Sequence, residues 1–470
     1  MLKKLLLTVI MTAFEVVSFC QTLNSDSLVI KEIIITGNYV TNKKVIFREL
    51  DFRINDRVRR EDIEYKRVTS VNNLIKTSLF NFVDISISEL TGNNLSVIVG
   101  LTERWYWWPN FYLNQNDRNF SEWWRTMDLN KLEYGIGIKA DNFRGQGEKL
   151  MLNYHIGNFT RYEVDYGGIY LDRAKKHSLS FQGFYLAQNI LPWNVEMNRE
   201  KVLKLDNKLM TSINLLLKYS FRKGFFTSHT IELGYSSTRI ADTIYLLNPD
   251  YEGLNNHRLN FLSVKYEFSH DTRDSKIYPK TGSLVVAGII RKGLGILPHE
   301  YSSTGFYGQL YLYRKLYNRV YAASGLWFYS IMADRYVFSS GTGLGYIQFV
   351  RGYEYYAVNG NNAFLFKSLV KYEVLPMKVI NLNFWPLKKV HQFNRVPFEI
   401  YANVFFDSGY VTDEFNVYRL NNNTLVNKLM YSTGVGVDFV TYYDKVLGLD
   451  YSFNGLGESG LFVHWKAAIR

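Results

Sequence analysis

The chain contains a single cysteine, Cys20, among its 470 residues. That cysteine ends an N-terminal segment in which Lys3 and Lys4 precede an apolar run over residues 5–19. The arrangement is typical of a cleaved secretory signal, which we assign to residues 1–20. The mature chain would then have no cysteine, and this excludes disulfides and thiolate metal sites. Acylation of Cys20, as in a lipoprotein, is the alternative, but the bulky residue before it argues against lipidation.

After residue 20 the sequence has no run of about eighteen apolar residues, which a membrane-spanning helix would need. Aromatic residues make up 16% of the chain and are mostly Tyr and Phe, whereas charged residues reach only 21%. In a secreted chain this composition is typical of a β-barrel with aromatic girdles at both membrane interfaces. Only strands in a closed barrel could then cross a bilayer, because every backbone polar group must be paired in lipid.

Two further patterns are missing. The net charge is +12, but the chain has no compact block of Lys and Arg. We therefore expect no nucleic-acid partner and assign the positive charge to loops that face lipid phosphates. The 8 histidines are scattered, and the zinc motif H-E-x-x-H is absent. We predict neither a metal nor a cofactor.

Residues 28–103 have the pattern of a small soluble α+β domain. The turn pairs Gly37-Asn38 and Gly92-Asn93 separate segments of strand and helix periodicity. Such an order closes one layer of helices over a three-stranded sheet. The expected elements, in the order β-α-α-β-β, cover residues 28–36, 43–50, 60–79, 82–89 and 95–101.

Residues 107–470 change to segments of about ten residues that alternate apolar and polar, which is the signature of a transmembrane β-barrel. In Leu209 to Phe221, for example, Leu215, Leu217 and Tyr219 share one face. The segment 332–362 is much longer than a hairpin loop, and loops of that length are usually functional. The even number of strands suits a bacterial barrel. We expect sixteen strands, at 107–115, 132–140, 147–157, 160–171, 177–187, 209–222, 227–240, 257–270, 281–292, 300–315, 319–331, 363–375, 397–408, 428–441, 444–454 and 460–469.

Four short motifs occur in order along this region. Asn142 to Gly147 reads NFRGQG at a hairpin turn, and Val350 to Tyr353 reads VRGY in the long loop. Phe405 to Gly409 reads FFDSG in the thirteenth expected strand. The turn between strands 257–270 and 281–292 carries Asp271, Arg273 and Asp274 of a DTRD sequence, followed by Pro279 and Gly282. In this order and register, the motifs make the chain resemble the Omp85 superfamily, the BamA- and TamA-like outer-membrane proteins.

The resemblance implies that the long loop folds back into the barrel, where its arginine contacts acidic residues of the inner wall. That would make Arg351, Gly352 and Tyr353 parts of a loop lock. The alternation of the strands places Glu373 and Asp407 on the inner wall, so that Arg351 meets Asp407, Glu373 or both through charge-assisted bonds. A solvated loop arginine with unrelated wall carboxylates is the alternative.

The family also implies a lateral seam between the first and last strands, through which a client strand is added. Here the seam would involve Phe111 and Leu113 on the first strand and Leu461, Val463 and Trp465 on the last. The domain over 28–103 would be a periplasmic POTRA domain. We therefore predict an outer-membrane insertion factor. Its partners would be outer-membrane lipid, unfolded outer-membrane or secreted clients, and periplasmic or lipoprotein subunits.

Other functions stay open at this point. One is a dedicated translocator that secretes its partner through the lumen, although residues 21–27 are too short for the plug helix that such proteins usually carry. A passive structural barrel is another, against which a periplasmic receptor domain argues. An enzyme is a third possibility. His270-Asp271 is the candidate catalytic pair, but no nucleophile motif accompanies it. We predict that the chain is not an enzyme.

Overall fold

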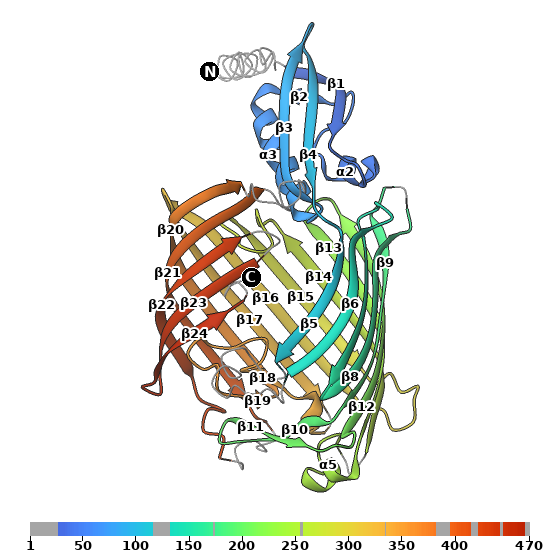
Figure 1. Cartoon of the computed structure of the whole chain (residues 1–470), viewed down its shortest axis with the longest axis vertical. Coiled ribbons are helices and arrows are strands. Elements are labelled where there is room, and N and C mark those ends of the chain that lie inside the picture. The colour runs from blue at the N-terminus through green and yellow to red at the C-terminus, as the bar shows by residue number, and fades with distance from the viewer. Residues whose placement is uncertain are drawn as a thin grey trace, which may run out of the picture.

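The chain folds into a small N-terminal α+β domain and a large β-barrel (Figure 1). The computed structural model describes residues 27–115, 132–172, 174–253, 257–333, 335–381, 395–414, 422–441 and 445–465. The predicted signal segment over residues 1–20 lies outside these ranges.

The N-terminal domain has one strand more than the sequence pattern predicts. Its sheet runs in the order β2-β1-β4-β3, and β1 pairs with β4 in parallel. Strand β2 has only three residues, too few for an alternation to be visible, although its central Val58 is buried. The elements are β1 (Ser27–Thr36), α2 (Lys43–Glu49), β2 (Arg57–Arg59), the 3-10 turn η1 (Arg60–Asp62), α3 (Ile63–Lys76), β3 (Phe80–Leu90) and β4 (Asn94–Glu103).

The barrel is a sixteen-stranded sheet in which each strand pairs antiparallel with its neighbours, and this confirms the predicted fold class. In sheet order its strands are β5 (Trp107–Gln115), β6 (Leu132–Phe143), β7 (Glu148–Gly157), β8 (Phe159–Tyr170), β9 (His177–Gln188), β12 (Met210–Lys223), β13 (Thr227–Ile240), β14 (Arg258–Asp271), β15 (Gly282–Lys292), β16 (Ser303–Tyr317), β17 (Val320–Ala333), β20 (Asn362–Asn381), β21 (Arg395–Thr412), β22 (Met430–Thr441), β23 (Lys445–Asn454) and β24 (Ser459–His464).

The two faces of the barrel wall differ because side chains alternate along each strand. Along β21, Val404 and Phe406 are exposed on the outside, whereas Asn403 and Asp407 are buried on the inside. Leu215 and Leu217 are likewise exposed on the outer face of β12. An outer apolar band over a polar interior is the pattern of a transmembrane barrel. No helix among the described residues is long and apolar enough to cross a membrane.

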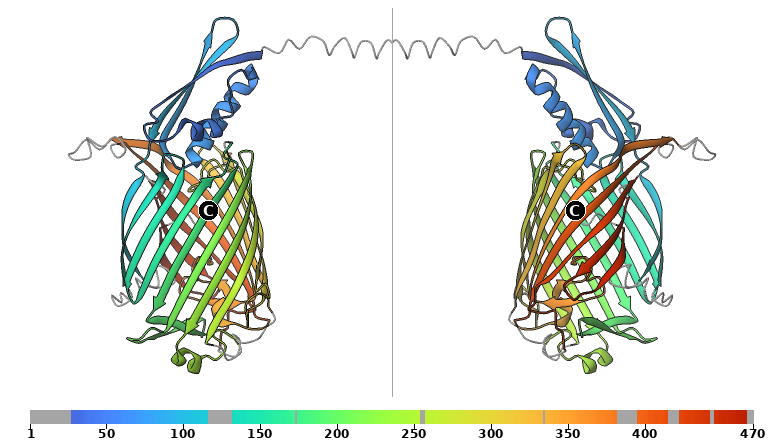
Figure 2. Two further views of the ribbon diagram at one scale, coloured as in Figure 1. Left: turned by 90° about the vertical axis from the view of Figure 1, so that its right-hand side faces the viewer. Right: turned by 90° about the vertical axis from the view of Figure 1, so that its left-hand side faces the viewer.

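One end of the barrel carries the N-terminal domain, and we call it the domain end. The other, the loop end, carries small elements that the sequence pattern did not separate from loops, because each is short (Figure 2). Apolar residues from several of these loops form one buried cluster that includes Leu191, Ile244, Val350 and Leu425. The elements are β10 (Ile190–Glu196), β11 (Arg199–Lys204), α5 (Asp242–Leu247), η3 (Phe338–Ser340), β18 (Thr342–Leu344) and β19 (Val358–Gly360).

Strands β5 and β24 are the two ends of the sheet. In the part of the chain that the structure describes, no ladder of backbone hydrogen bonds joins them. Figure 1 views the barrel from this side, with β24 to the left, β5 to the right and strands of the far wall visible between them. Strand β24 is short, since only its six residues Ser459–His464 pair with β23.

Candidate functional site

The loop between β17 and β20 enters the barrel instead of extending from it. Val350, Arg351, Tyr353 and Glu354 are all buried, although they belong to a connection between two strands. Gly352 has φ +82°, and a Cβ atom there would lie 3.2 Å from the Cβ of Ser452 on β23. The absence of a side chain at Gly352 therefore lets the loop backbone lie directly against the inner wall.

Arg351 forms a two-pronged ion pair with Asp407 on β21. Its Nε donates to Oδ2 at 2.8 Å and its Nη2 donates to Oδ1 at 2.7 Å. The backbone N–H of Arg351 donates to the same carboxylate at 3.3 Å. Arg351 is 1% exposed and Asp407 is 0% exposed. Two parallel charge-assisted bonds fix both the position and the orientation of the guanidinium group.

Further charged and aromatic groups surround this pair. The guanidinium carbon of Arg351 lies 3.6 Å from the ring centroid of Phe405, which is a cation–π contact. Its Nη1 lies 4.0 Å from Asp450 Oδ2 on β23. The ammonium group of Lys367 lies 4.5 Å from the ring centroid of Phe349. The barrel wall therefore presents both carboxylate groups and an ammonium group to the loop.

The loop also contacts the last strand. His464 Nε2, on β24, lies 3.4 Å from Glu354 of the loop and 3.6 Å from Asp450. The phenol oxygen of Tyr353 accepts a hydrogen bond from the backbone N–H of Gly455 at 3.1 Å, in the turn between β23 and β24. Asn454 Nδ2 donates to the carbonyl of Gly352 at 2.8 Å. The VRGY motif thus binds the hairpin that ends the barrel sheet.

Glu373 does not meet Arg351, so its assignment to the loop lock was wrong. In the sheet, Glu373 stands opposite Tyr401, which is six residues along β21 from Asp407. Six residues of a strand span roughly 20 Å, so one arginine cannot reach both carboxylates. Glu373 instead accepts a charge-assisted bond from Lys280 at 2.9 Å. The inward direction predicted from the alternation was right, whereas the partner depended on distance along the strand.

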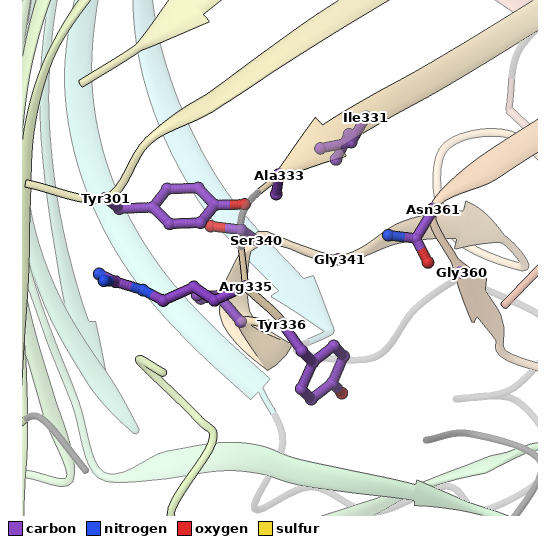
Figure 3. A pocket seen from close by; sticks show the side chains of 10 residues that line it. Tyr301, Ile331, Ala333, Arg335, Tyr336, Ser340, Gly341, Gly360 and Asn361 are labelled. Carbon is purple, nitrogen blue, oxygen red and sulfur yellow. The ribbon is translucent and has the colours of Figure 1, made fainter. Parts of the chain in front are cut away.

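Figure 3 shows the base of the same loop, where Arg335 and Tyr336 follow β17. The guanidinium carbon of Arg335 lies 5.8 Å from the ring centroid of Tyr301. The hollow between these side chains and Asn361 has a volume of about 20 Å³. That is roughly the space of one water molecule, so this hollow is too small for an organic ligand.

The motif turn over residues 272–281 has a defined backbone at the domain end. Arg273 forms two bonds of 2.9 Å to Asp271, through Nε and Nη2. Asp274 Oδ1 accepts from the backbone N–H of Lys280 at 3.0 Å. Gly282 has φ +97°, and a Cβ atom there would lie 2.4 Å from the carbonyl oxygen of Thr272. The motif residues thus fold the turn, and Asp271 is bound to Arg273.

This turn extends Tyr278 to the inner wall of β21 and β22. The Tyr278 hydroxyl donates to Asp438 at 2.7 Å, and its ring centroid lies 4.8 Å from that of Tyr401. Lys371 Nζ lies 3.7 Å from the Tyr278 ring centroid and donates to the Pro279 carbonyl at 2.8 Å. The contact between Tyr278 and Asp438 was not predicted from the sequence. Tyr278 lies between Asp274 and Gly282 of the motif, and this position was the signal in the sequence that could have pointed to its role.

At the seam, the predicted side chains face outward where they are described. Phe111 on β5 is 82% exposed, and Leu461 and Trp465 are also strongly exposed. Val463 is partly buried. The Leu113 side chain lies outside the described part of the structure. Within the described ranges, no group of three or more His, Cys, Asp or Glu residues is arranged to hold a metal ion.

The remaining motif, over residues 142–147, holds the N-terminal domain. Asn142 Nδ2 donates to Thr41 Oγ1 at 2.9 Å, and the backbone N–H of Asn42 donates to the Gly145 carbonyl at 2.8 Å. A Cβ atom at Gly145, which has φ +68°, would lie 2.3 Å from the Val40 carbonyl oxygen. The turn therefore needs glycine here to let the domain approach.

Two solved structures have a similar fold. The structure of BamA from Haemophilus ducreyi lacking POTRA domains 1-3 aligns with a TM-score of 0.50 and 15% identity, over 93% of this chain and 83% of that chain. CdiB from Escherichia coli aligns with a TM-score of 0.56 and 9% identity, over 93% of this chain and 75% of that chain. The resemblance to the Omp85 superfamily is therefore confirmed at the level of the fold. No protein-family model and no curated protein matches the sequence.

Proposed function

We propose that this chain is an outer-membrane protein assembly factor of the Omp85 type. It would insert client barrels through the lateral seam between β5 and β24. The single observation that supports this most strongly is the pair of sheet ends, which no hydrogen-bond ladder joins in the described part of the chain. Unpaired backbone groups at such an edge accept an additional strand. The N-terminal domain would be a POTRA domain in the periplasm, where its sheet edges receive clients or partner subunits.

The contents of the lumen favour this function over secretion through the barrel. The loop lock at Arg351 and Asp407 lies inside the barrel, and Tyr278 extends to the same inner wall from the other end. Both segments would have to leave before a polypeptide could pass. A lateral seam needs no such clearance. In this proposal the loop lock holds in place the part of the wall that β21, β22, β23 and β24 form, while client strands are added at the seam. The chain catalyses no covalent chemistry.

Site-specific photo-crosslinking in cells tests the proposal. A benzophenone amino acid replaces Leu461, which faces outward at the seam, and each captured protein is identified by mass spectrometry. Leu215 is the matched control, because it is also exposed and outward-facing but lies on β12, away from both strands of the seam. Lys218, on the inner face of β12, is the probe for the lumen.

Each outcome of this experiment has a distinct meaning. Capture of several unrelated barrel proteins at Leu461, but not at Leu215 or Lys218, supports insertion. Capture of one dedicated protein at Lys218 would establish the alternative, a translocator. Depletion of the chain gives an independent readout: a broad fall of outer-membrane barrels is expected, and an unchanged outer-membrane proteome would contradict the assembly function.

A further inference from the structure

A second hollow lies where the N-terminal domain meets the barrel, away from the lock and the seam. Its volume is about 590 Å³, within the usual range for a small-molecule site. Helix α2 and the segment that follows it form one side. Residues 174–176 and 222–225, at two turns of the barrel, form the other side. We call this hollow the junction pocket.

The lining of the junction pocket is strongly basic. None of the described residues that line it is acidic. Its six cationic residues are Lys44, Arg48, Arg53, Lys175, Lys176 and Arg222. The carboxylate beside it, on Glu49, is already engaged: it lies 2.6 Å from Arg48 and accepts bonds of 2.7 and 2.9 Å from Arg222. One buried carboxylate thus faces two guanidinium groups, and no ion pair among the described residues involves Lys44, Arg53, Lys175 or Lys176.

Lys175 shows this imbalance most clearly. It is 6% exposed, yet its ammonium group donates to neutral oxygens, the side-chain and backbone carbonyls of Gln146, at 2.5 and 3.4 Å. Burial, assisted by the nearby charge of Arg48, lowers the pKa of Lys175 to about 8. A buried cation of this kind gains from an anion beside it, because attraction is strong where water is scarce.

The pocket also has an apolar part. Phe47 and Ile54 line it and are exposed to a large extent, and Phe225 contributes an aromatic ring. Exposed apolar side chains next to a row of cations suit a ligand that is itself amphiphilic. A soluble anion would use the cations alone.

The position of the pocket indicates which amphiphile it meets. On the outer face of the barrel, His177 stacks on Phe221 with ring centroids 4.9 Å apart. The row continues through His229, which lies 6.1 Å from Phe221 and 5.5 Å from Phe268. Aromatic rows of this kind mark the membrane–water interface of a barrel. The pocket-lining residues 174–176 precede His177, and residues 224–225 follow Phe221, all within four residues. They therefore lie at the depth of the lipid head groups.

We propose that the junction pocket binds the phosphate-bearing head group of an anionic lipid from the adjoining leaflet. The cations surround the phosphate, and Phe47, Ile54 and Phe225 contact the glycerol and upper acyl region. The lipid thereby bridges α2 of the N-terminal domain and the barrel rim. The proposal rests on the placement of the barrel in a membrane, but it does not require that the chain inserts clients.

The test measures lipid retained by the purified full-length protein in detergent, by native mass spectrometry, during titration with phosphatidylglycerol. The pocket variant combines Lys44→Gln and Lys175→Gln. Lys31→Gln with Lys204→Gln is the matched control, because it removes the same charge from positions outside the pocket. Each lysine near an anionic surface contributes about 1 kcal/mol of binding free energy. The pocket variant should therefore bind the lipid at least about tenfold more weakly, and the affinity of the control variant should be unchanged. Folding is checked by the heat-dependent shift of barrel migration on gels.

Competition experiments distinguish a lipid phosphate from a free phosphate as the ligand. Phosphatidylcholine, which is zwitterionic, should not displace the bound lipid, and inorganic pyrophosphate should displace it only at far higher concentration. Equal displacement by pyrophosphate would show a site for free phosphate and would overturn the lipid assignment. Equal binding by the pocket and control variants would overturn the site itself. Neither result depends on assembly activity, so failure of the proposed function would leave this inference standing.

Discussion

Two segments reach the inner wall from opposite ends of the barrel, and they are held by different chemistry. The loop that carries Arg351 is held by a fully buried ion pair with Asp407. The turn that carries Tyr278 is held by a hydroxyl bond, ring contacts and Lys280, which has two carboxylate partners, at 2.9 Å from Glu373 and 3.2 Å from Glu399. The loop thus has a fully buried ion pair in addition to its hydrogen bonds to Asn454 and Gly455, whereas the ion pairs of the turn are partly exposed. This difference predicts how each responds to single substitutions.

The largest effect is expected at the loop. Arg351→Ala leaves the buried carboxylate of Asp407 without its partner, and breaking a buried pair in this way costs about 3–5 kcal/mol. Limited proteolysis should then cleave within residues 335–361 faster than in the unchanged protein. Glu373→Gln is the control, since Glu373 binds Lys280 at the other end of the wall. Equal cleavage of the Arg351→Ala variant and the unchanged protein would refute the lock.

A smaller effect is expected at the turn. Tyr278→Phe removes the 2.7 Å bond to Asp438 but keeps the ring contacts with Tyr401 and Lys371. A hydrogen bond to a charged group contributes about 1.5–3 kcal/mol, so the midpoint of urea unfolding should fall without release of the loop. Loop cleavage in Tyr278→Phe as fast as in Arg351→Ala would show that the two attachments are not separate.

A still smaller effect should link the loop to the seam. His464→Gln replaces the imidazole that lies 3.4 Å from Glu354 and 3.6 Å from Asp450. An interaction of this length at a partly exposed histidine contributes about 1 kcal/mol or less. Amide hydrogen exchange should rise in β24 and stay unchanged in β21. His229→Gln on the outer face is the control, and an identical exchange pattern in both variants would exclude the link.

The last effect is expected only in acid, at the junction of domain and barrel, where Glu49 pairs with the partly exposed Arg222. Burial alone would raise the pKa of Glu49, but the guanidinium groups of Arg222 and Arg48 more than offset this and lower it below its ordinary value of 4.5. A carboxyl with a lowered pKa stabilises the folded state above its ordinary pKa, and this contribution is lost as the pH falls below 4.5. Spin-label distances between domain and barrel should therefore broaden in acid. Glu49→Gln should remove that dependence, and a pH response retained in Glu49→Gln would assign it elsewhere.

Much of the fold could be predicted from the sequence because strand alternation is a local signal. Leu215 and Leu217 show the outer face without any knowledge of the neighbouring strands. Strand β2 and the hairpin of β10 and β11 were missed because a few residues carry no periodicity. At the site, alternation correctly placed Asp407 and Glu373 on the inner wall. Which of them Arg351 meets depends on how far the loop enters, and that is set by packing between distant segments.

The attachment of the N-terminal domain has a mechanical consequence. The domain is connected to the barrel at three separate places: by the chain itself at Trp107, by the 142–147 turn against residues 40–42, and by Glu49 against Arg222. Three fixed points leave a rigid body no axis about which to swing. A load applied to the domain is therefore transmitted to β5, β6 and β12, and β5 is one side of the seam. The domain and the barrel rim therefore move as one body, and a force on the domain reaches the seam through β5.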